Sequence, residues 1–448
     1  METFEYMTGV KLQDDADVAG IFAHPEEYAG REVAVRGAVH AVRDMGDIKF
    51  VVIRRREGIL QAVCDGDVPG FPAEGLRDET RVKVRGTLRL EERAPHGLEL
   101  KVSRMEILSV PAAPMPIAVS KWKMNASLEA KLDMRPLTLR NLRERAKFKI
   151  QEAVVRSFRD FLTAQGFTEI HSPKIGAKGA EGGANIFKLD YFHRPAVLAQ
   201  SPQFYKQIMV GVFDRVYEVG PVFRAEKHNT KRHLNEYTGL DFEMGYIDGF
   251  EDIMAMETGF LQAMAGLLRR EYRPELELLS VEFPKVDKIP QVTFDRAKAL
   301  VSETYHRQMR NPFDLEPEEE ALIGKYFKDT CGADFVFVTH YPSKKRPFYA
   351  MDDPADPRYT LSFDLLFRGM EVTTGGQRIH DYAMLMEKIE RRGMTGEGME
   401  QYLSAFKHGM PPHGGLGIGL ERLTMQLIGE ENVREVSLFP RDMSRLEP

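Results

Sequence analysis

The chain has 448 residues, of which 43% are hydrophobic and 29% are charged, an ordinary composition for a soluble globular protein. No apolar run approaches the roughly 18 residues that span a bilayer, and the early residues carry acids without the apolar core of a signal peptide, so we expect a cytoplasmic protein that binds no membrane. The net charge of −6 argues against a protein that coats nucleic acid non-specifically, and two distant cysteines, Cys64 and Cys331, do not indicate a disulfide framework.

The length is too great for one compact core, so we expect two domains. Residues 30–110 contain short strands separated by glycine-containing turns, a pattern that predicts a small closed β-barrel. Residues 109–121 are rich in proline and alanine, which is typical of a linker or hinge. We therefore predict a barrel domain at 1–108, a linker at 109–135 and a larger domain at 136–448.

The larger domain alternates between helical and strand patterns. Apolar residues at helical spacing run up to Gly166, and a strand carrying Pro173 follows. Further strands are expected at 216–224, 239–247, 333–340 and 361–375, and further helices at 251–272 and from Ile418 onward. This order predicts an antiparallel sheet with flanking helices, and the fold class is α+β.

Residues 223–243, FRAEKHNTKRHLNEYTGLDFE, form a strand, a basic loop and a second strand that ends in acids. Arg224 can bind an α-phosphate through its paired donors, and Glu226 can accept from the exocyclic amine of a purine. Arg232 and His233 in the loop can reach the outer phosphates. A charge run alone would favour a solvated hairpin instead.

Residues 414–422, GGLGIGLER, place glycines before a helix. Glycines let the backbone approach a ligand closely, and Arg422, one turn inside the helix, could cover a nucleotide. A glycine-rich stretch before a helix is weak evidence when taken alone.

Residues 363–378, FDLLFRGMEVTTGGQR, contain a carboxylate near a hydroxyl, which suits magnesium that also holds triphosphate oxygens. On one regular strand Asp364 and Glu371 would face opposite sides, and Thr374 would share the face of Asp364 unless a bulge shifts the register. The alternative is an ordinary half-buried strand with outward acids.

Together the three segments resemble the signature motifs of the class II aminoacyl-tRNA synthetases, a family that binds ATP bent over an antiparallel sheet. FRAE with the RHL loop looks like the second motif, GLGIGLER like the third, and GFTEIHSPKI, around Pro173, like the first, through which the family forms homodimers. The resemblance implies catalytic roles for Arg224, Arg422 and Glu371, and a magnesium site at Glu371 and Thr374. The implied ATP-binding residues are Arg224, Ala225, Glu226, Arg232, His233, Leu234, Glu371, Gly419, Leu420, Glu421 and Arg422.

Within the family, an N-terminal OB-fold barrel marks the subgroup that serves aspartate, asparagine and lysine. QSPQFYKQ, RAEKHNTKRHLNE, GMPPHGG and REVSLFPRD most resemble the archaeal-type aspartyl enzymes. The implied reaction is attack of the aspartate carboxylate on the α-phosphorus of ATP, followed by transfer of the aspartyl group to tRNA, with no protein nucleophile.

Aspartate carries one ammonium and two carboxylates, so its site needs about two cations and one or two anions. By resemblance Arg378 binds the side-chain carboxylate and Lys206 strengthens the positive pocket. Glu181 and Asp241 are the candidate ammonium partners, and the run around Glu181 could close over the substrate. The full set implied to bind aspartate is Glu181, Gln203, Phe204, Tyr205, Lys206, Arg224, Asp241, Thr374 and Arg378.

Lys206 decides between aspartate and asparagine, because a neutral amide would leave the second buried cation unpaired. Thr374 stands where the resembling enzymes carry serine, and the hydroxyl is retained. The alternatives are an asparaginyl enzyme, a synthetase-like RNA-binding paralogue and an enzyme that makes free asparagine on the same scaffold.

The barrel is expected to read the anticodon through stacking and polar contacts. By resemblance Phe50 stacks on the central uridine and Gln61 hydrogen-bonds it, although position alone leaves Phe50 equally consistent with the core. His40 stands where enzymes that charge both tRNA-Asp and tRNA-Asn carry histidine and strict ones carry tryptophan. We therefore hypothesise a non-discriminating enzyme. The alternative is that His40 merely fills the barrel rim.

Overall fold

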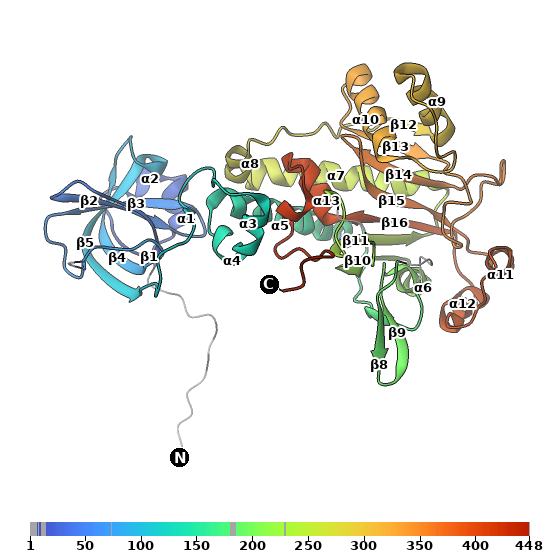
Figure 1. Ribbon diagram of the computed structural model, residues 1–448, viewed down its shortest axis with the longest axis horizontal. Helices are drawn as coiled ribbons and strands as arrows, with labels where there is room; N and C mark the ends of the chain where they lie inside the picture. Colours follow the sequence, from blue (N-terminus) through green and yellow to red (C-terminus); the bar gives the residue numbers. More distant parts are fainter. Residues whose placement is uncertain are drawn as a thin grey trace, which may run out of the picture. The chain divides into compact units, whose positions relative to one another are not determined.

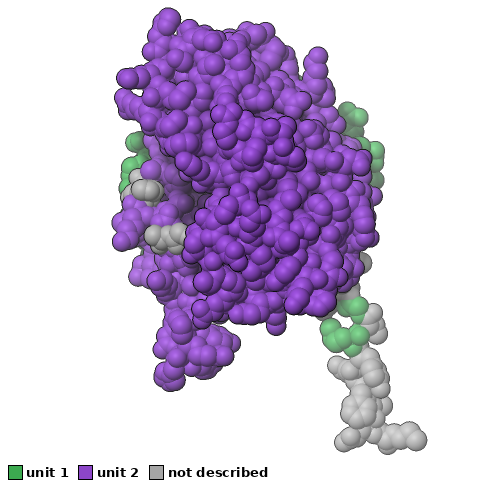
Figure 2. All heavy atoms as spheres, turned by 90° about the vertical axis from the view of Figure 1, so that its right-hand side faces the viewer, with its two compact units in different colours: residues 1–142 green, residues 143–448 purple. Residues whose placement is uncertain are grey.

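The structure is a computed structural model that describes residues 7, 9, 15–72, 74–179, 185–227 and 230–447. The chain divides into two compact units, Met1–Leu142 and Arg143–Pro448, which Figure 2 shows in separate colours. None of the described helices is long and apolar enough to cross a membrane.

The first unit is built around a closed five-stranded barrel (Figure 1). Its strands are β1 (Glu32–Asp44), β2 (Ile48–Arg54), β3 (Ile59–Asp65), β4 (Arg81–Leu90) and β5 (Leu98–Ser109). They follow the order β1-β2-β3-β5-β4, and pairing of β1 with β4 closes the barrel. Alternate side chains, such as Val35, Val51 and Val84, point into the core. The predicted N-terminal barrel is confirmed.

Helical segments flank the barrel in the same unit. The helices are α1 (Val18–Ala23) and α2 (Pro25–Tyr28) before it, and α3 (Leu128–Asp133) and α4 (Arg135–Thr138) after it. Residues 110–127, all of them described, contain no helix or strand.

The second unit contains an eight-stranded sheet (Figure 1). In spatial order its strands are β12 (Gln291–Thr293), β13 (Phe335–Thr339), β14 (Ser362–Phe367), β15 (Met370–Arg378), β16 (His413–Gly419), β11 (Glu236–Gly245), β10 (Arg215–Phe223) and β6 (Thr168–Glu169). The pairs from β13 to β10 are antiparallel, while β12 and β6 join the two edges in parallel. The predicted α+β class is confirmed, with a sheet that is mixed at its edges.

One face of the sheet is covered by the longest helices, α5 (Leu142–Ala164) and α7 (Glu251–Glu271), with α13 (Leu420–Ile428) at the end of β16. Phe158, Phe260 and Leu423 from these helices pack into one core with the sheet side chains Phe242 and Leu416. Because side chains alternate along a strand, the residues between them face the opposite side. That opposite face carries the polar groups of the site.

Smaller elements surround this framework. The helices are α6 (Gln203–Phe213), α8 (Arg273–Leu279), α9 (Phe294–Tyr305), α10 (Pro317–Cys331), α11 (Tyr382–Arg391) and α12 (Glu400–Lys407). A separate three-stranded sheet contains β7 (Ile175–Gly176), β9 (Arg194–Leu198) and β8 (Lys188–Tyr191). Apolar side chains of α6, α11 and α12 share a satellite core.

The prediction of one strand at 361–375 is wrong. The segment is a hairpin of β14 and β15, and its turn lies at Arg368 and Gly369, whose φ angles are 47° and 75°. Asp364 therefore pairs across the hairpin with Thr374, and the register shifts so that Leu365 faces Thr373 while Leu366 faces Glu371. The extra residue is a β-bulge, which changes the face on which the following side chains lie.

Candidate active site

A cavity of about 460 Å³ lies in the second unit. It gathers most of the residues that the sequence predicted for ATP and aspartate: Gln203, Lys206, Arg224, Glu226, Arg232, His233, Leu234, Asp241, Glu371, Thr374, Arg378, Gly419, Glu421 and Arg422. They come from α6, from the β10–β11 and β14–β15 hairpins and from the β16–α13 junction.

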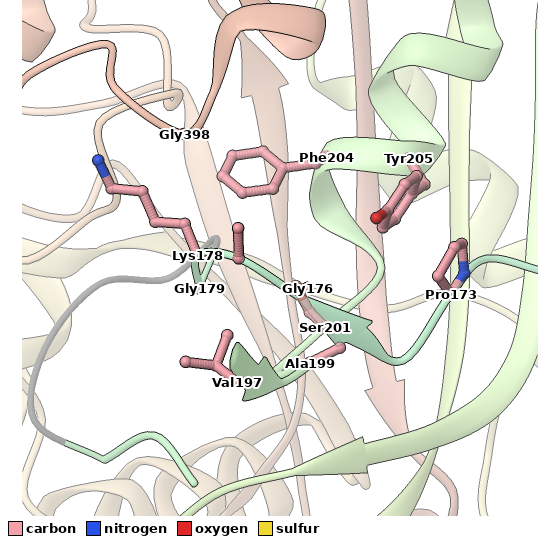
Figure 3. Close-up of a pocket in the computed structure, with 11 residues that line it drawn as sticks. Pro173, Gly176, Lys178, Gly179, Val197, Ala199, Ser201, Phe204, Tyr205 and Gly398 are labelled. Carbon is pink, nitrogen blue, oxygen red and sulfur yellow. The ribbon is translucent and has the colours of Figure 1, made fainter. Parts of the chain in front are cut away.

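The other predicted residues lie elsewhere. Phe204 and Tyr205 line a smaller recess of about 80 Å³, beside Lys178 and Gly398 (Figure 3). Ser201 lines both spaces, so the recess adjoins the cavity. Ala225 and Leu420 do not line the cavity, although the residues on both sides of each do. Glu181 falls outside the described residues.

At one end of the cavity two cations and two carboxylates form a row of ion pairs in the order Asp241, Lys206, Glu243 and Arg378. Lys206 Nζ lies 3.0 Å from Asp241 Oδ1 and 3.3 Å from Glu243 Oε2, and it donates to the Leu416 carbonyl at 2.9 Å. Arg378 donates from Nε to Glu243 Oε1 at 2.8 Å, and from Nη2 to the Gly415 carbonyl at 2.9 Å. All four side chains are buried.

The pKa values of Asp241 and Glu243 are shifted in opposite directions, although both carboxylates contact Lys206. Burial raises the pKa of Asp241, and the charge of Lys206 only partly opposes that effect. Burial acts on Glu243 in the same direction, but Arg378 and Lys206 together hold its pKa below the ordinary value. Glu243 is therefore the permanent anion of this end.

The glycines of β16 make room for these acids. Gly417 stands opposite Asp241 and Gly415 opposite Glu243 in the register of the two strands. A Cβ added to Gly415 would lie 2.2 Å from Glu243 Oε2, and one added to Gly417 would lie 3.0 Å from Asp241 Oδ1. The sequence predicted that these glycines let a ligand approach the backbone closely. In the structure they also leave space for the acidic side chains of the neighbouring strand β11.

In another part of the cavity, the nucleotide end, two arginines make longer charge contacts. Arg422 Nη1 lies 3.7 Å from Glu371 Oε1, and its Nε donates to the Arg232 carbonyl at 3.1 Å. Arg224 Nη1 lies 3.9 Å from Glu226 Oε1. Both guanidinium groups oppose the rise that burial causes in the pKa of Tyr237. The positive charges of Arg224 and Arg422 therefore both act on the Tyr237 hydroxyl.

The basic loop is joined to α10. Arg232 donates from Nη2 to Glu320 Oε2 at 2.5 Å, and Glu320 Oε2 also accepts from the Glu371 backbone N–H at 3.1 Å. His233 Nε2 lies 3.7 Å from Glu226 Oε2. The loop side chains that were expected to reach phosphates thus line the cavity beside acids that hold them in place.

Asp364 and Glu371 form the centre best suited to a divalent cation. Thr374 Oγ1 donates to Glu371 Oε1 at 3.3 Å, and Arg346 Nη2 donates to Asp364 Oδ1 at 2.8 Å. Burial raises the pKa of Asp364 to about 6, with Arg346 opposing and Glu371 adding to the rise. Two carboxylates that repel each other in this way fit a hard cation with oxygen ligands.

The described residues contain no group of three or more His, Cys, Asp or Glu side chains that could hold a metal ion. A cation at Asp364 and Glu371 would therefore need further ligands from water and from a bound phosphate, as magnesium commonly has. On one regular strand Asp364 and Glu371 would face opposite sides, but the hairpin turn and the bulge bring both of them to the cavity beside Thr374.

Several residues that line or support the cavity were not predicted. They are Glu243, Asp364 as part of the carboxylate pair, Arg346, Gln207, Tyr402 and His413. Glu243 could have been found from the sequence, because residues two apart on a strand share a face and Asp241 was already predicted to bind the substrate. Gln207, Tyr402 and His413 meet only through the fold.

The barrel residues belong to the first unit. Arg43 lies over the Phe50 ring, 5.5 Å from its centroid, and donates from Nη2 to Gln61 Oε1 at 3.2 Å. Gln61 in turn donates to Glu99 Oε2 at 2.9 Å. A ring, a guanidinium and an amide thus stand together on the barrel wall, a combination that suits an unstacked base.

His40 has a different setting. It lies at the register shift of β1 and is buried, with its Nδ1 3.1 Å from Arg54 Nη1. Arg54 makes a two-bond contact with Glu79, at 2.7 and 2.8 Å. His40 therefore faces an internal ion pair.

The chain matches two families of known proteins. Residues 127–443 match the family described as tRNA synthetases class II (D, K and N), and residues 33–108 match the OB-fold nucleic acid binding domain. A Deinococcus radiodurans protein named aspartate–tRNA(Asp/Asn) ligase is 47% identical over 428 residues, which cover 94% of this chain and 97% of that protein. A Pyrococcus abyssi protein named aspartate–tRNA(Asp) ligase is 41% identical over 431 residues, with coverage of 94% and 98%.

A solved structure also has the same fold. The asparaginyl-tRNA synthetase from Pyrococcus horikoshii, complexed with asparaginyl-adenylate, superposes with a TM-score of 0.87 at 31% identity. The superposition covers 94% of this chain and 97% of that one.

Proposed function

The chain belongs to the class II aminoacyl-tRNA synthetases of the D, K and N group, and we propose that it is an aspartate–tRNA ligase. It activates L-aspartate with ATP to aspartyl-adenylate and transfers the aspartyl group to tRNA. The observation that carries the choice of amino acid is the buried set of Lys206, Arg378, Asp241 and Glu243.

The charges of that set match aspartate rather than lysine or asparagine. Arg378 binds the side-chain carboxylate of the substrate, and Lys206 adds a second positive charge behind it. Asp241 lines the same cavity and is the anion available to the ammonium group, since Glu243 is engaged by both cations. A lysyl enzyme would need acids at the position of Arg378.

An asparagine–tRNA ligase is the second candidate, and the likeness to an asparaginyl enzyme favours it. Against it stands Lys206, which is 2% exposed. The neutral amide of asparagine would gain less from the positive charge of Lys206 and Arg378 than the side-chain carboxylate of aspartate does.

The chemistry needs positioning and charge stabilisation. Arg224 binds the α-phosphate of ATP and offsets the charge that develops there when the aspartate carboxylate attacks. Arg422 lines the same cavity and holds the nucleotide there. Glu371, with Asp364 and Thr374, would hold a magnesium ion, which would neutralise phosphate charge when bound.

Measurement of amino-acid-dependent ATP–pyrophosphate exchange tests the assignment. We expect aspartate to stimulate exchange and asparagine and lysine to leave it near background. Exchange that is supported by asparagine and not by aspartate would replace the proposal with the asparaginyl alternative.

We further propose that the enzyme charges both tRNA-Asp and tRNA-Asn. Relatives named for both tRNAs and the presence of His40 support this. Because His40 is buried against Arg54, its effect would come from shaping the barrel wall. Aminoacylation of the two purified transcripts tests it; full charging of tRNA-Asp beside no charging of tRNA-Asn would rule it out.

A homodimer is proposed through the region around Pro173. The neighbouring strand β6 is the last strand of the large sheet, so one of its edges is unpaired within the sheet and suits pairing with a second copy. Sedimentation equilibrium would test this, and a monomer at assay concentrations would contradict it.

A further inference from the structure

A buried polar network stands directly behind the amino-acid end of the cavity. Gln203 and Gln207 come from α6, Tyr402 from α12 and His413 from the start of β16. All four side chains are buried, and only Gln203 lines the cavity. The role of the other three is not explained by direct contact with a substrate.

The direction of the hydrogen bonds in this network follows from one carbonyl group. His413 Nδ1 lies 2.8 Å from the Pro411 carbonyl oxygen, which can only accept, so Nδ1 carries the proton. Burial lowers the pKa of His413 to about 4, so the ring is neutral near pH 7. Its Nε2 therefore has a lone pair and must accept.

The remaining hydrogen bonds then have only one arrangement. Gln207 Nε2 lies 2.9 Å from His413 Nε2 and is the donor, which turns Gln207 Oε1 the other way. That oxygen accepts from the Tyr402 hydroxyl at 3.1 Å and from Gln203 Nε2 at 2.9 Å. The amide of Gln203 is thus held with its nitrogen toward Gln207.

This arrangement determines which end of the Gln203 amide is available to a ligand in the cavity. With the nitrogen of the Gln203 amide committed to Gln207, its carbonyl oxygen is the end that remains for a ligand, and none of the described residues donates a hydrogen bond to it. An ammonium group has donors only. A carbonyl oxygen attracts it, whereas a reversed amide would present N–H against N–H.

We propose that Gln207, itself held by His413 and Tyr402, is a positioning residue that sets the amide of Gln203 so that its carbonyl oxygen accepts from the ammonium group of aspartate. This inference rests on the proposed function. It assigns His413, Gln207 and Tyr402 to the recognition of the amino end of the substrate.

A double-mutant cycle in ATP–pyrophosphate exchange tests the proposal. We expect Gln207→Met to raise the KM for aspartate by about 10- to 100-fold, the effect of losing a hydrogen bond to a charged group, and to leave the KM for ATP within about twofold. In a Gln203→Met background the same substitution should add nothing, because it acts through Gln203.

Gln262→Met provides a matched control. Gln262 lies on α7 and donates to the Val286 and Asp287 carbonyls away from the cavity. We expect this variant to keep the KM for aspartate of the unmodified enzyme. Independent, additive effects of Gln203→Met and Gln207→Met, or a rise in both KM values, would overturn the proposal.

The tautomer of His413 is tested without any activity. The 15N spectrum of the histidine-labelled full chain, with the signal assigned by its loss in His413→Asn, should show a neutral ring protonated at Nδ1 at pH 7. An Nε2-protonated or charged ring would overturn the network even if aspartate is the substrate. Aspartate-independent exchange with the expected tautomer would instead refute the proposed function alone.

Discussion

The two ends of the cavity hold their charges in different ways. At the amino-acid end Lys206 and Glu243 are 2% and 0% exposed, and the ion pairs there are 2.8–3.3 Å long. At the nucleotide end Arg422 and Arg224 are 24% and 41% exposed, and their ion pairs are 3.7 and 3.9 Å long.

Under the proposed function, this difference would separate recognition of the amino acid from the reaction with ATP. Buried, paired charges cannot relax toward a wrong ligand, so the amino-acid end is preorganised for one arrangement of carboxylate and ammonium. The exposed guanidinium groups can move onto phosphates and follow the charge as it develops. Stability and selectivity should therefore depend on one end, and rate on the other.

The largest effect is expected for Arg378→Ala. It removes the group that we propose binds the substrate carboxylate, so kcat/KM for aspartate in pyrophosphate exchange should fall by about 10⁴-fold. It also leaves Glu243 with Lys206 alone, which should lower the free energy of unfolding by about 3–5 kcal/mol. Denaturant unfolding measured beside exchange would show both losses, and an unchanged stability would contradict the buried-pair account.

A smaller effect, confined to activity, is expected for Arg422→Ala. Loss of one charge that stabilises the transition state should lower kcat/KM by about 10²- to 10³-fold. Because its ion pair is long and partly exposed, the free energy of unfolding should change by less than about 1 kcal/mol. If Arg422→Ala destabilises the protein as much as Arg378→Ala, the contrast between the ends is false.

Glu371→Gln should change the response to magnesium. With one of two paired carboxylates neutral, the magnesium concentration for half-maximal exchange should rise by about 10- to 100-fold. The pKa of Asp364, about 6 with Glu371 charged, should fall, because one cause of its rise is removed. A magnesium titration checks the first result, and an unaltered midpoint would exclude Glu371 as a ligand.

The smallest effect on activity is expected at Glu257, which lies on α7, does not line the cavity and accepts from the Thr373 hydroxyl at 2.6 Å. Burial raises its pKa from an ordinary 4.5 to about 8. Between these values the folded protein binds a proton that the unfolded chain lacks, so stability should fall as pH rises. Between pH 5 and pH 8 the melting temperature of the unmodified protein should fall relative to that of Glu257→Gln. If the two proteins show the same dependence of melting temperature on pH, the raised pKa of Glu257 is refuted.

The sequence was informative where chemistry is local. Glycine-containing turns predicted the barrel, and periodic apolar residues predicted α5 and α7. Arg224, Lys206, Arg378 and Arg422 carried signals through motifs that the family shares, and all four line one cavity.

The sequence was not informative where the register of two strands, or a contact between residues far apart in the chain, decides the position of a side chain. The turn at Arg368–Gly369 lies inside an otherwise continuous strand pattern, so Asp364 and Glu371 were expected on opposite faces, whereas both line the cavity. His413 meets Gln207, which is 206 residues away in the chain, and no spacing rule connects them. Glu243 was missed because an acid in a strand is usually exposed, whereas this one is buried between two cations.

The preference of the enzyme for aspartate over asparagine, compared between the unmodified protein and Lys206→Gln, tests the central claim most directly. The measured quantity is the ratio of kcat/KM values in pyrophosphate exchange. We predict a strong preference for aspartate that falls by about 100-fold in the variant, because the second cation behind the substrate carboxylate is gone. An equal ratio in both proteins, or a preference for asparagine in the unmodified one, would contradict the account.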